Sequence, residues 1–140
     1  MCNDVLTHLE AALSRAASQQ PDTGGFPYLA ACLRQEGFIK NTWYLPSGDS
    51  FYFSNEASLV IPGKPLIDAA CSCPPFSESE LITVLRMDQS GQTTFTAFLM
   101  GAWHSGVVKY EEDFTQIQVT YYGAKNEVYK ERYPLVEINE

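Results

Sequence analysis

Apolar residues recur at helical spacing in four stretches of the chain, which form two pairs. The apolar positions run over residues 5–16 and 29–33 in the first pair and over residues 81–85 and 95–103 in the second. Spacings of three and four residues place such side chains along one face of an α-helix. The pattern therefore predicts two pairs of helices, one in each half of the chain.

Residues with known preferences for helix ends support these boundaries. Pro27 suits the first turn of the second helix, where its missing N–H costs no hydrogen bond. Ser77 and Glu80 have the spacing of a capping box at the start of the third helix. Gly37 and Gly106 follow the second and fourth helices and suit the left-handed conformation that ends many helices. Each predicted pair of helices therefore stops at a glycine.

Three short strand-like stretches follow each helix pair, separated by residues that favour turns. In the second set the apolar side chains alternate with polar ones, as they do in a sheet with one buried face. The short turns between successive strands predict antiparallel pairing. The predicted strands cover residues 38–45, 50–53 and 58–61 in the first half, and residues 108–114, 117–121 and 128–133 in the second.

The two halves of the chain repeat this order of elements at an offset of 69 residues. Over residues 26–61 only four residues are identical to those at the offset, too few for identity alone to establish a duplication. The order of elements nevertheless predicts the topology: one α+β domain over residues 1–140, built from two helix-helix-three-strand halves (1–70 and 71–140), with an antiparallel sheet packed under the helices. The seam between the halves is then a natural place for a site. The identical pairs are Phe26 and Phe95, Gly37 and Gly106, Lys40 and Lys109, and Tyr52 and Tyr121.

Length and composition are those of one folded domain. Hydrophobic residues make up 45% of the 140 residues and aromatic residues 13%, which is ample for a packed core. We therefore expect the chain to fold without metals, disulfides or cofactors.

The charge balance bears on the class of partner. The formal net charge is −8 at pH 7, and the pI is near 4.6. Lys125, Lys130 and Arg132 lie near the C-terminus but are interleaved with Glu127 and Glu131. A phosphate backbone is bound by basic residues that cluster on one face. The sequence therefore predicts no direct binding of nucleic acid.

The start of the chain and its apolar stretches bear on location. Residues 1–4 lack the basic start and apolar run of a signal peptide, and the longest apolar stretches are too short to span a bilayer. We therefore predict a cytoplasmic protein that does not engage membranes, in which the four cysteines are reduced thiols.

Cys71 and Cys73 provide the one motif-like cysteine spacing. One intervening residue in a strand puts both sulfurs on the same side, where they would bind a metal or oxidise. Structural zinc sites usually have four ligands, with paired cysteines two to four residues apart, and the remaining cysteines and histidines have no such spacing. Ordinary thiols in a proline-rich connector are the favoured interpretation, and a metal pair is the alternative.

His104 is the candidate for acid–base chemistry. It lies at the predicted end of the fourth helix, where the helix dipole stabilises a protonated imidazole without any catalytic role. The functional alternative is a general base oriented by Glu111, Glu112 or Asp113 on the next strand. Those carboxylates alternate between the faces of a strand, so we interpret them as a solvated strand end rather than a cation site. His8 is interpreted as a boundary residue of the first helix.

Aromatic residues are concentrated on the predicted strands, and alternation sends them to both faces of the sheet. An exposed aromatic face marks a site for a protein partner or for a second copy of the chain; cross-strand stabilisation is the plain alternative. Trp43, Trp103, Tyr110 and Tyr122 are the candidate binding residues. No nucleotide-binding, zinc-protease or serine-hydrolase motif occurs in the sequence.

These observations favour a non-enzymatic protein-binding module, with a homodimer as one form. The rival hypothesis is a small-molecule pocket at the seam between the halves, walled by Trp43, Trp103 and Tyr110, with weak hydrolase-like catalysis at His104.

Several segments resemble the YbcV-like family of small bacterial and prophage proteins, some of which are labelled "phage envelope protein". The resemblance implies a bacterial or prophage origin, and the family brings no established activity and no catalytic residues. The resembling segments are Gly25-Phe26-Pro27-Tyr28, Asn41-Thr42-Trp43-Tyr44-Leu45-Pro46, Asp88-Gln89-Ser90-Gly91, Gly106-Val107-Val108-Lys109-Tyr110-Glu111, Val119-Thr120-Tyr121-Tyr122-Gly123 and Tyr133-Pro134.

Overall fold

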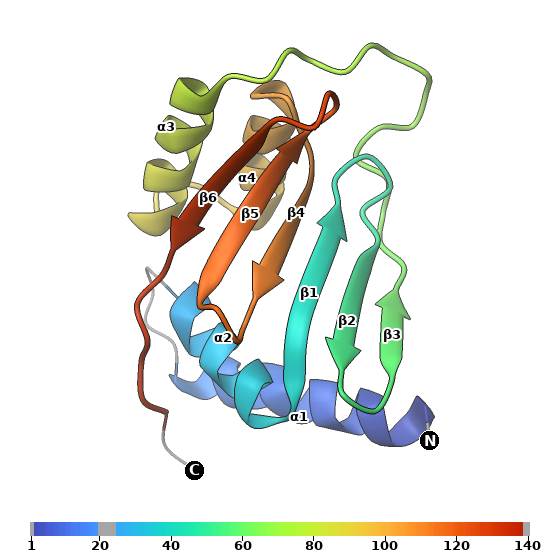
Figure 1. Cartoon of the computed structure of the whole chain (residues 1–140), viewed down its shortest axis with the longest axis vertical. Helices are drawn as coiled ribbons and strands as arrows, with labels where there is room; N and C mark the ends of the chain where they lie inside the picture. The colour runs from blue at the N-terminus through green and yellow to red at the C-terminus, as the bar shows by residue number, and fades with distance from the viewer. Residues whose placement is uncertain (1, 20–24, 139–140) are drawn as a thin grey trace.

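The computed structural model of the chain describes residues 2–19 and 25–138. Within these residues a helix, a helix and three strands follow one another twice, which confirms the predicted α+β order (Figure 1). The elements are α1 Cys2–Gln19, α2 Phe26–Gln35, β1 Phe38–Tyr44, β2 Ser50–Ser54, β3 Ser58–Ile61, α3 Glu78–Gln89, α4 Phe95–His104, β4 Val107–Asp113, β5 Gln118–Gly123 and β6 Val128–Arg132.

The predicted helix ends also form as expected. The Ser77 side chain accepts a hydrogen bond from the Glu80 backbone N–H at 3.3 Å at the start of α3. Pro27 lies in the first turn of α2. Gly37 and Gly106 adopt left-handed φ angles of 97° and 93° directly after α2 and α4. Local capping chemistry therefore sets where these helices begin and end.

The strands form one antiparallel sheet in the order β3-β2-β1-β4-β5-β6. β1 and β4, the first strands of the two halves, are paired at its centre (Figure 1). The helices pack against one face of this sheet, because the side chains buried with them come from alternate positions of the strands. Among the residues that the structure describes, no helix lies on the other face, and we call it the open face.

The central pairing is symmetric about one point. Thr42 of β1 lies opposite Glu111 of β4, and these two residues are 69 positions apart, the offset of the repeat. Every flanking pair, such as Lys40 with Asp113, is therefore matched by an equivalent pair on the other side of that point. The halves are thus related by a pseudo-two-fold axis through the middle of the sheet.

A β-bulge marks the same position in both halves. The register between β1 and β2 shifts between Phe38 and Lys40, and that between β4 and β5 shifts between Val107 and Lys109. Both shifts follow the left-handed glycine that ends a helix. A bulge bends its strand and changes the direction of the side chains beyond it. The chain therefore passes from helix to strand through the same glycine and bulge in both halves.

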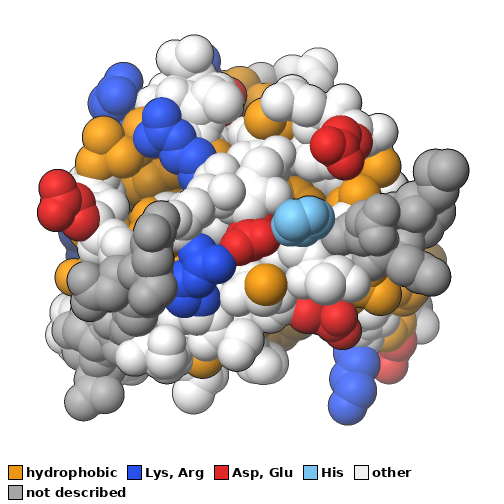
Figure 2. All heavy atoms as spheres, turned by 90° about the horizontal axis from the view of Figure 1, so that it is seen from below, with side chains coloured by type: hydrophobic (Ala, Val, Ile, Leu, Met, Phe, Trp, Pro, Cys, Tyr) orange, Lys and Arg blue, Asp and Glu red, His pale blue; other side chains and the backbone are white. Residues whose placement is uncertain are grey.

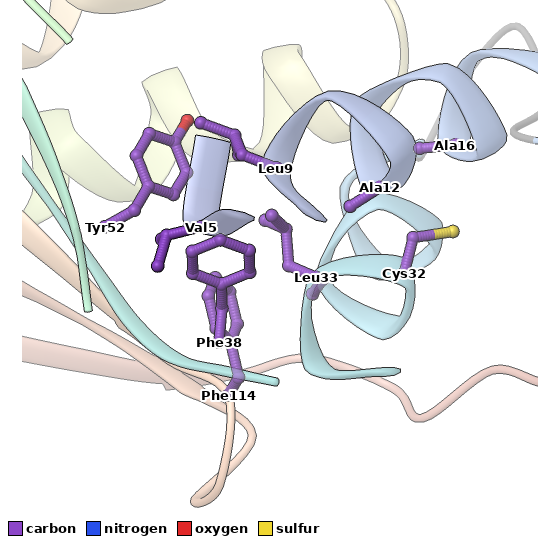
Figure 3. Packing of buried hydrophobic residues seen from close by; sticks show 10 residues of the cluster. Val5, Leu9, Ala12, Ala16, Cys32, Leu33, Phe38, Tyr52 and Phe114 are labelled. Atoms are coloured by element: carbon purple, nitrogen blue, oxygen red, sulfur yellow. The ribbon is translucent and has the colours of Figure 1, made fainter. Parts of the chain in front are cut away.

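The buried residues form two cores, one under each helix pair. The residue directly after each central strand buries its side chain in the core of the opposite half: Phe114 joins the first core, and Leu45 joins the second. Figure 3 shows the first core, which Phe114 enters from the end of β4. The first core comprises Val5, Leu9, Ala12, Ala16, Ala30, Cys32, Leu33, Phe38, Tyr52 and Phe114. The second comprises Leu45, Leu81, Leu85, Phe98, Ala102, Trp103, Val107, Tyr110, Val119 and Tyr121.

The two helix-ending glycines allow a matched test of what each one contributes. A methyl group at Gly37 meets nothing within 4 Å, whereas at Gly106 it would lie 2.6 Å from the backbone nitrogen of Phe76. We expect Gly37→Ala to lower the free energy of unfolding by about 1 kcal/mol, the cost of a left-handed alanine. Gly106→Ala should cost at least about 1–3 kcal/mol more, because the backbone must also move.

Urea unfolding of both variants measures these differences. Equal losses for the two variants would contradict the close approach of the connector to Gly106.

Candidate functional site

The open face is lined by the strand positions that alternate with the buried ones. Asn41, Tyr52, Tyr110 and Tyr121 are buried beneath the helices, so their neighbours along each strand point the other way. The open face comprises Lys40, Thr42, Tyr44, Phe51, Phe53, Ser58, Val60, Lys109, Glu111, Asp113, Gln118, Thr120, Tyr122, Val128, Lys130 and Arg132.

Two lysines lie over aromatic rings at equivalent positions of this face. The Lys40 ammonium is 4.9 Å from the ring centroid of Phe53, and the Lys109 ammonium is 4.9 Å from that of Tyr122. Lys109 also lies 6.0 Å from the ring of Tyr44. Such cation–π contacts hold flexible lysines in place over flat rings. Tyr122, a predicted binding residue, is thus part of the open face.

Further aromatic rings extend the open face toward the β3 edge. The rings of Tyr44 and Phe51 meet edge-on at 5.8 Å, and those of Phe51 and Phe53 stack at 6.2 Å. Tyr44 is 39% exposed and Val60 is 45% exposed. This half of the open face is therefore an accessible apolar surface, the kind of feature that marks an interaction site.

Charges of both signs lie at the centre of the open face. Lys40 is paired across the strands with Asp113, and Thr42 donates a hydrogen bond to Glu111 at 3.4 Å. Burial raises the pKa of Asp113, but hydrogen bonds from Gln116 and Thr115 outweigh it, so the net pKa is lowered. Asp113 is therefore ionised beside Lys40 at neutral pH.

A second polar position lies on the helix-facing side of the sheet, at the seam between the cores. Glu112 lies between Tyr110 of the second core and Phe114 of the first. Its side chain is only 8% exposed, and its cross-strand neighbour Asn41 is 1% exposed. Our interpretation of the acidic run as a solvated strand end is thus wrong for Glu112, because strand alternation turns that residue inward.

Burial dominates the electrostatics of Glu112. It raises the pKa of this carboxyl group to about 8, and no charge or hydrogen bond from the described residues offsets the shift. Burial, and after it the Glu112 charge, raises the pKa of Tyr52 and of Tyr133 to about 12. Glu112 is therefore predominantly protonated at neutral pH.

The structure brings three predicted binding residues together. Trp43 and Tyr110 stack with ring centroids 6.4 Å apart, and Trp103 lies in the same second core. Trp103 is 5% exposed and Tyr110 is 3% exposed. These side chains fill the seam on the side of α4, and Tyr122 lies on the opposite face of the sheet.

His104 lies exposed at the end of α4. Among the described residues it forms no hydrogen bond with Glu111, Glu112 or Asp113. The first and last of these belong to the open face, and Glu112 is buried at the seam.

Cys71 and Cys73 lie exposed in the connector between the halves. Cys32 is buried, and burial raises the pKa of its thiol. Within residues 2–19 and 25–138, no group of three or more histidine, cysteine or acidic side chains is placed to hold a metal ion. In the same residues, no helix combines the length and the apolar character needed to cross a membrane.

A surface ion-pair cluster that the sequence did not predict links α1 to the end of α2. Glu36 accepts contacts from His8 Nδ1 at 2.7 Å and from Arg15 Nη2 at 2.6 Å. The His8 contact lowers the pKa of Glu36 most. Figure 2 shows this face, with a histidine and basic atoms on either side of an acidic side chain. His8 and Glu36 are 28 residues apart in sequence, so no local pattern signals their pairing.

A shallow groove that is open to solvent lies beside this cluster. Its polar Ser54 hydroxyl is engaged in its own turn, bonding the backbone of Glu56 and Ala57. We therefore interpret the cluster as a helix-docking contact.

The fold and these positions define a class: an α+β domain with one covered and one open sheet face. The chain belongs to the family described as "Protein of unknown function (DUF1398)", whose model matches residues 15–132. It is 40% identical over 132 residues to "Uncharacterized protein Mb2035" of Mycobacterium bovis, covering 94% of this chain and 80% of the relative. The same values hold for "Uncharacterized protein MT2067" of Mycobacterium tuberculosis. Neither these names nor the family description mentions a phage envelope.

The burial of Glu112 predicts a specific pH dependence of stability. The unfolded chain releases the Glu112 proton near pH 4.5, whereas the folded protein retains it until about pH 8. As the pH rises from about 4.5 to about 8, the contribution of Glu112 to the free energy of unfolding therefore falls by about 1.4 kcal/mol per pH unit. Above pH 8 this contribution is constant. Glu112→Gln should match the wild type near pH 4 and exceed it by a few kcal/mol at pH 8.

Urea unfolding across pH 4–9 tests this. Glu111→Gln on the open face is the matched control. A wild type and a Glu112→Gln variant with parallel profiles would contradict the assignment.

Proposed function

We propose that the protein is a non-enzymatic binding module that forms a homodimer through the open face of its sheet. The observation that carries this proposal is the surface of aromatic rings and lysines on a sheet whose other face alone is covered by helices. An open sheet with such a surface is stabilised when a second layer covers it.

The size of the open face is suited to this role. With strands about 4.8 Å apart and about 3.3 Å per residue, six strands of about five residues give a flat area of roughly 500 Å². Protruding side chains increase the accessible area beyond this projection. Stable interfaces bury about 800 Å² per partner, so the open face is of the right order for a dimer.

The charge pattern supports a second copy as the occupant. A two-fold axis parallel to the strands, between β1 and β4, places β1 of one copy over β4 of the other at matching heights. Lys40 of one copy then lies over Asp113 of its partner, and Lys109 over the Tyr44 ring, because these residues are cross-strand partners. Both contacts are attractive, and each occurs twice.

Charge reversal tests this arrangement between molecules. Lys40→Glu and Asp113→Lys should each weaken the homodimer, because each juxtaposes like charges across the two-fold axis. An equimolar mixture of the two variants should restore dimers. In the mixed dimer one contact joins the introduced carboxylate to the introduced ammonium, and the other keeps the native Lys40 opposite the native Asp113.

Light scattering coupled to size-exclusion chromatography measures the mass of each variant and of the mixture, and thermal unfolding of each variant checks its fold. Two variants that stay monomeric when mixed would refute the proposed axis.

An apolar pair of variants tests the surface itself. Val60 on the open face is 45% exposed, and Leu13 on α1 is 41% exposed. Val60→Lys should raise the dimer dissociation constant at least about tenfold, because it buries an unpaired charge at the interface. Leu13→Lys is the control and should leave the constant unchanged. A wild type that stays monomeric at high micromolar concentration overturns the homodimer, and capture of single-stranded oligonucleotides by such a monomer would indicate a different partner.

A further inference from the structure

The two halves can be compared position by position at the seam, and they differ there. Trp43 and Glu112 occupy equivalent places 69 residues apart, as do Asn41 and Tyr110. In the second core, Trp43 stacks on Tyr110 and meets the ring of Phe95 edge-on at 5.2 Å. The same fold thus fills one side of the seam with stacked aromatic rings and the other with a carboxyl and an amide.

The C-terminal segment fills the space at the polar side. Phe26 is the equivalent of Phe95, and its ring meets that of Tyr133 edge-on at 4.9 Å. Both rings pack against both cores. Tyr133 follows the end of β6, and we call residues 133–138, which form no helix or strand, the strap.

The strap is weakly attached. Among the described residues, its one backbone hydrogen bond runs from Tyr133 N–H to the Ile117 carbonyl at 3.3 Å. Leu135 is 67% exposed. Ile138 packs against the first core beyond it. A shallow surface depression with room for about one water molecule lies between the strap and α2. Few contacts would break if the strap moved away from the seam.

The groups facing Glu112 are tyrosines from each neighbouring element. Tyr52 of β2, Tyr110 of β4, Tyr121 of β5 and Tyr133 of the strap are each affected by its charge. Burial first, and the Glu112 charge after it, raises the pKa of all four, so they remain neutral throughout the range in which Glu112 titrates.

Charged groups lie further out. Arg34 of α2 and Asp113 act on Tyr133, and Asp88 of α3 acts on Tyr110 and Tyr121. Glu112 itself owes the shift of its pKa to burial rather than to any of these charges. An ionised Glu112 would therefore lack a compensating cation among the described residues.

We propose that the strap is a proton-controlled cover, which lies closed over the seam while Glu112 is protonated and lifts away when Glu112 loses its proton. A buried, uncompensated carboxylate is costly, and admitting water relieves it. The sheet and helices around Glu112 are held by two cores. Among the described residues, the strap is held by one backbone hydrogen bond, one ring contact and the packing of Tyr133 and Ile138 against the cores. Lifting the strap removes the Tyr133 ring from the boundary between the two cores, and it is therefore the least costly way to hydrate the carboxylate.

Methyl NMR of the full-length protein tests this. The Leu135 and Val136 methyl groups report on the strap, and the side-chain carboxyl carbon of Glu112 reports on the proton. We expect all three to titrate with one common midpoint between about pH 4.5, the value of a solvated glutamate, and about pH 8, the value of the buried carboxyl, because opening relieves the burial. Glu112→Gln should abolish the methyl titration, and Glu111→Gln should preserve it.

Two results overturn the proposal. Either the carboxyl carbon titrates while the strap methyls do not follow, or the strap methyls titrate unchanged in Glu112→Gln. The wild-type titration decides the first point even if a variant fails to fold. Neither result depends on the open face, so the homodimer is tested separately.

Discussion

The structure depends on one interaction, the antiparallel pairing of β1 with β4. This pairing places Thr42 and Glu111 at the centre of the sheet. It also brings the end of each central strand against the core of the other half. Leu45 and Phe114 are 1% and 0% exposed, each in the core of the opposite half. Neither helix pair can therefore complete its core without the other half, and two similar units become one cooperative domain.

The open face and the seam follow from this exchange. Because both helix pairs dock on the side where the exchanged residues lie, the opposite side of the sheet is left uncovered. Because each central strand passes from one core to the other, some position on it must lie between the cores. On β1 and β4 those positions are Asn41 and Glu112. A polar residue is less disruptive at a boundary between two cores than in the middle of either.

The sequence predicted what local chemistry decides. The cap at Ser77 and the left-handed glycines Gly37 and Gly106 lie where helix-end preferences placed them, and the three strands after each helix pair followed from turns and alternation. The pairing of His8 with Glu36 was not predictable, because it depends on how α1 lies on α2. Ile117 was also missed: its φ of 58° is unusual for a β-branched residue, and the glycine signal that marks such a turn is absent.

For the acidic residues of β4, the sequence did not predict which side chain is buried. Alternation correctly implied that Glu111, Glu112 and Asp113 do not share a face, but it did not say which face was covered. That depends on the register with β1, in which Glu112 lies beside buried Asn41. The same register places Glu111 and Asp113 on the open face. A slip of one residue would bury two carboxylates and expose the third, so the central pairing fixes both surfaces at once. Trp43 at the equivalent position of β1 shows that the fold accepts an apolar residue there. The buried carboxyl of Glu112 is therefore not a requirement of folding, and its cost in stability is the reason to look for its role at the seam.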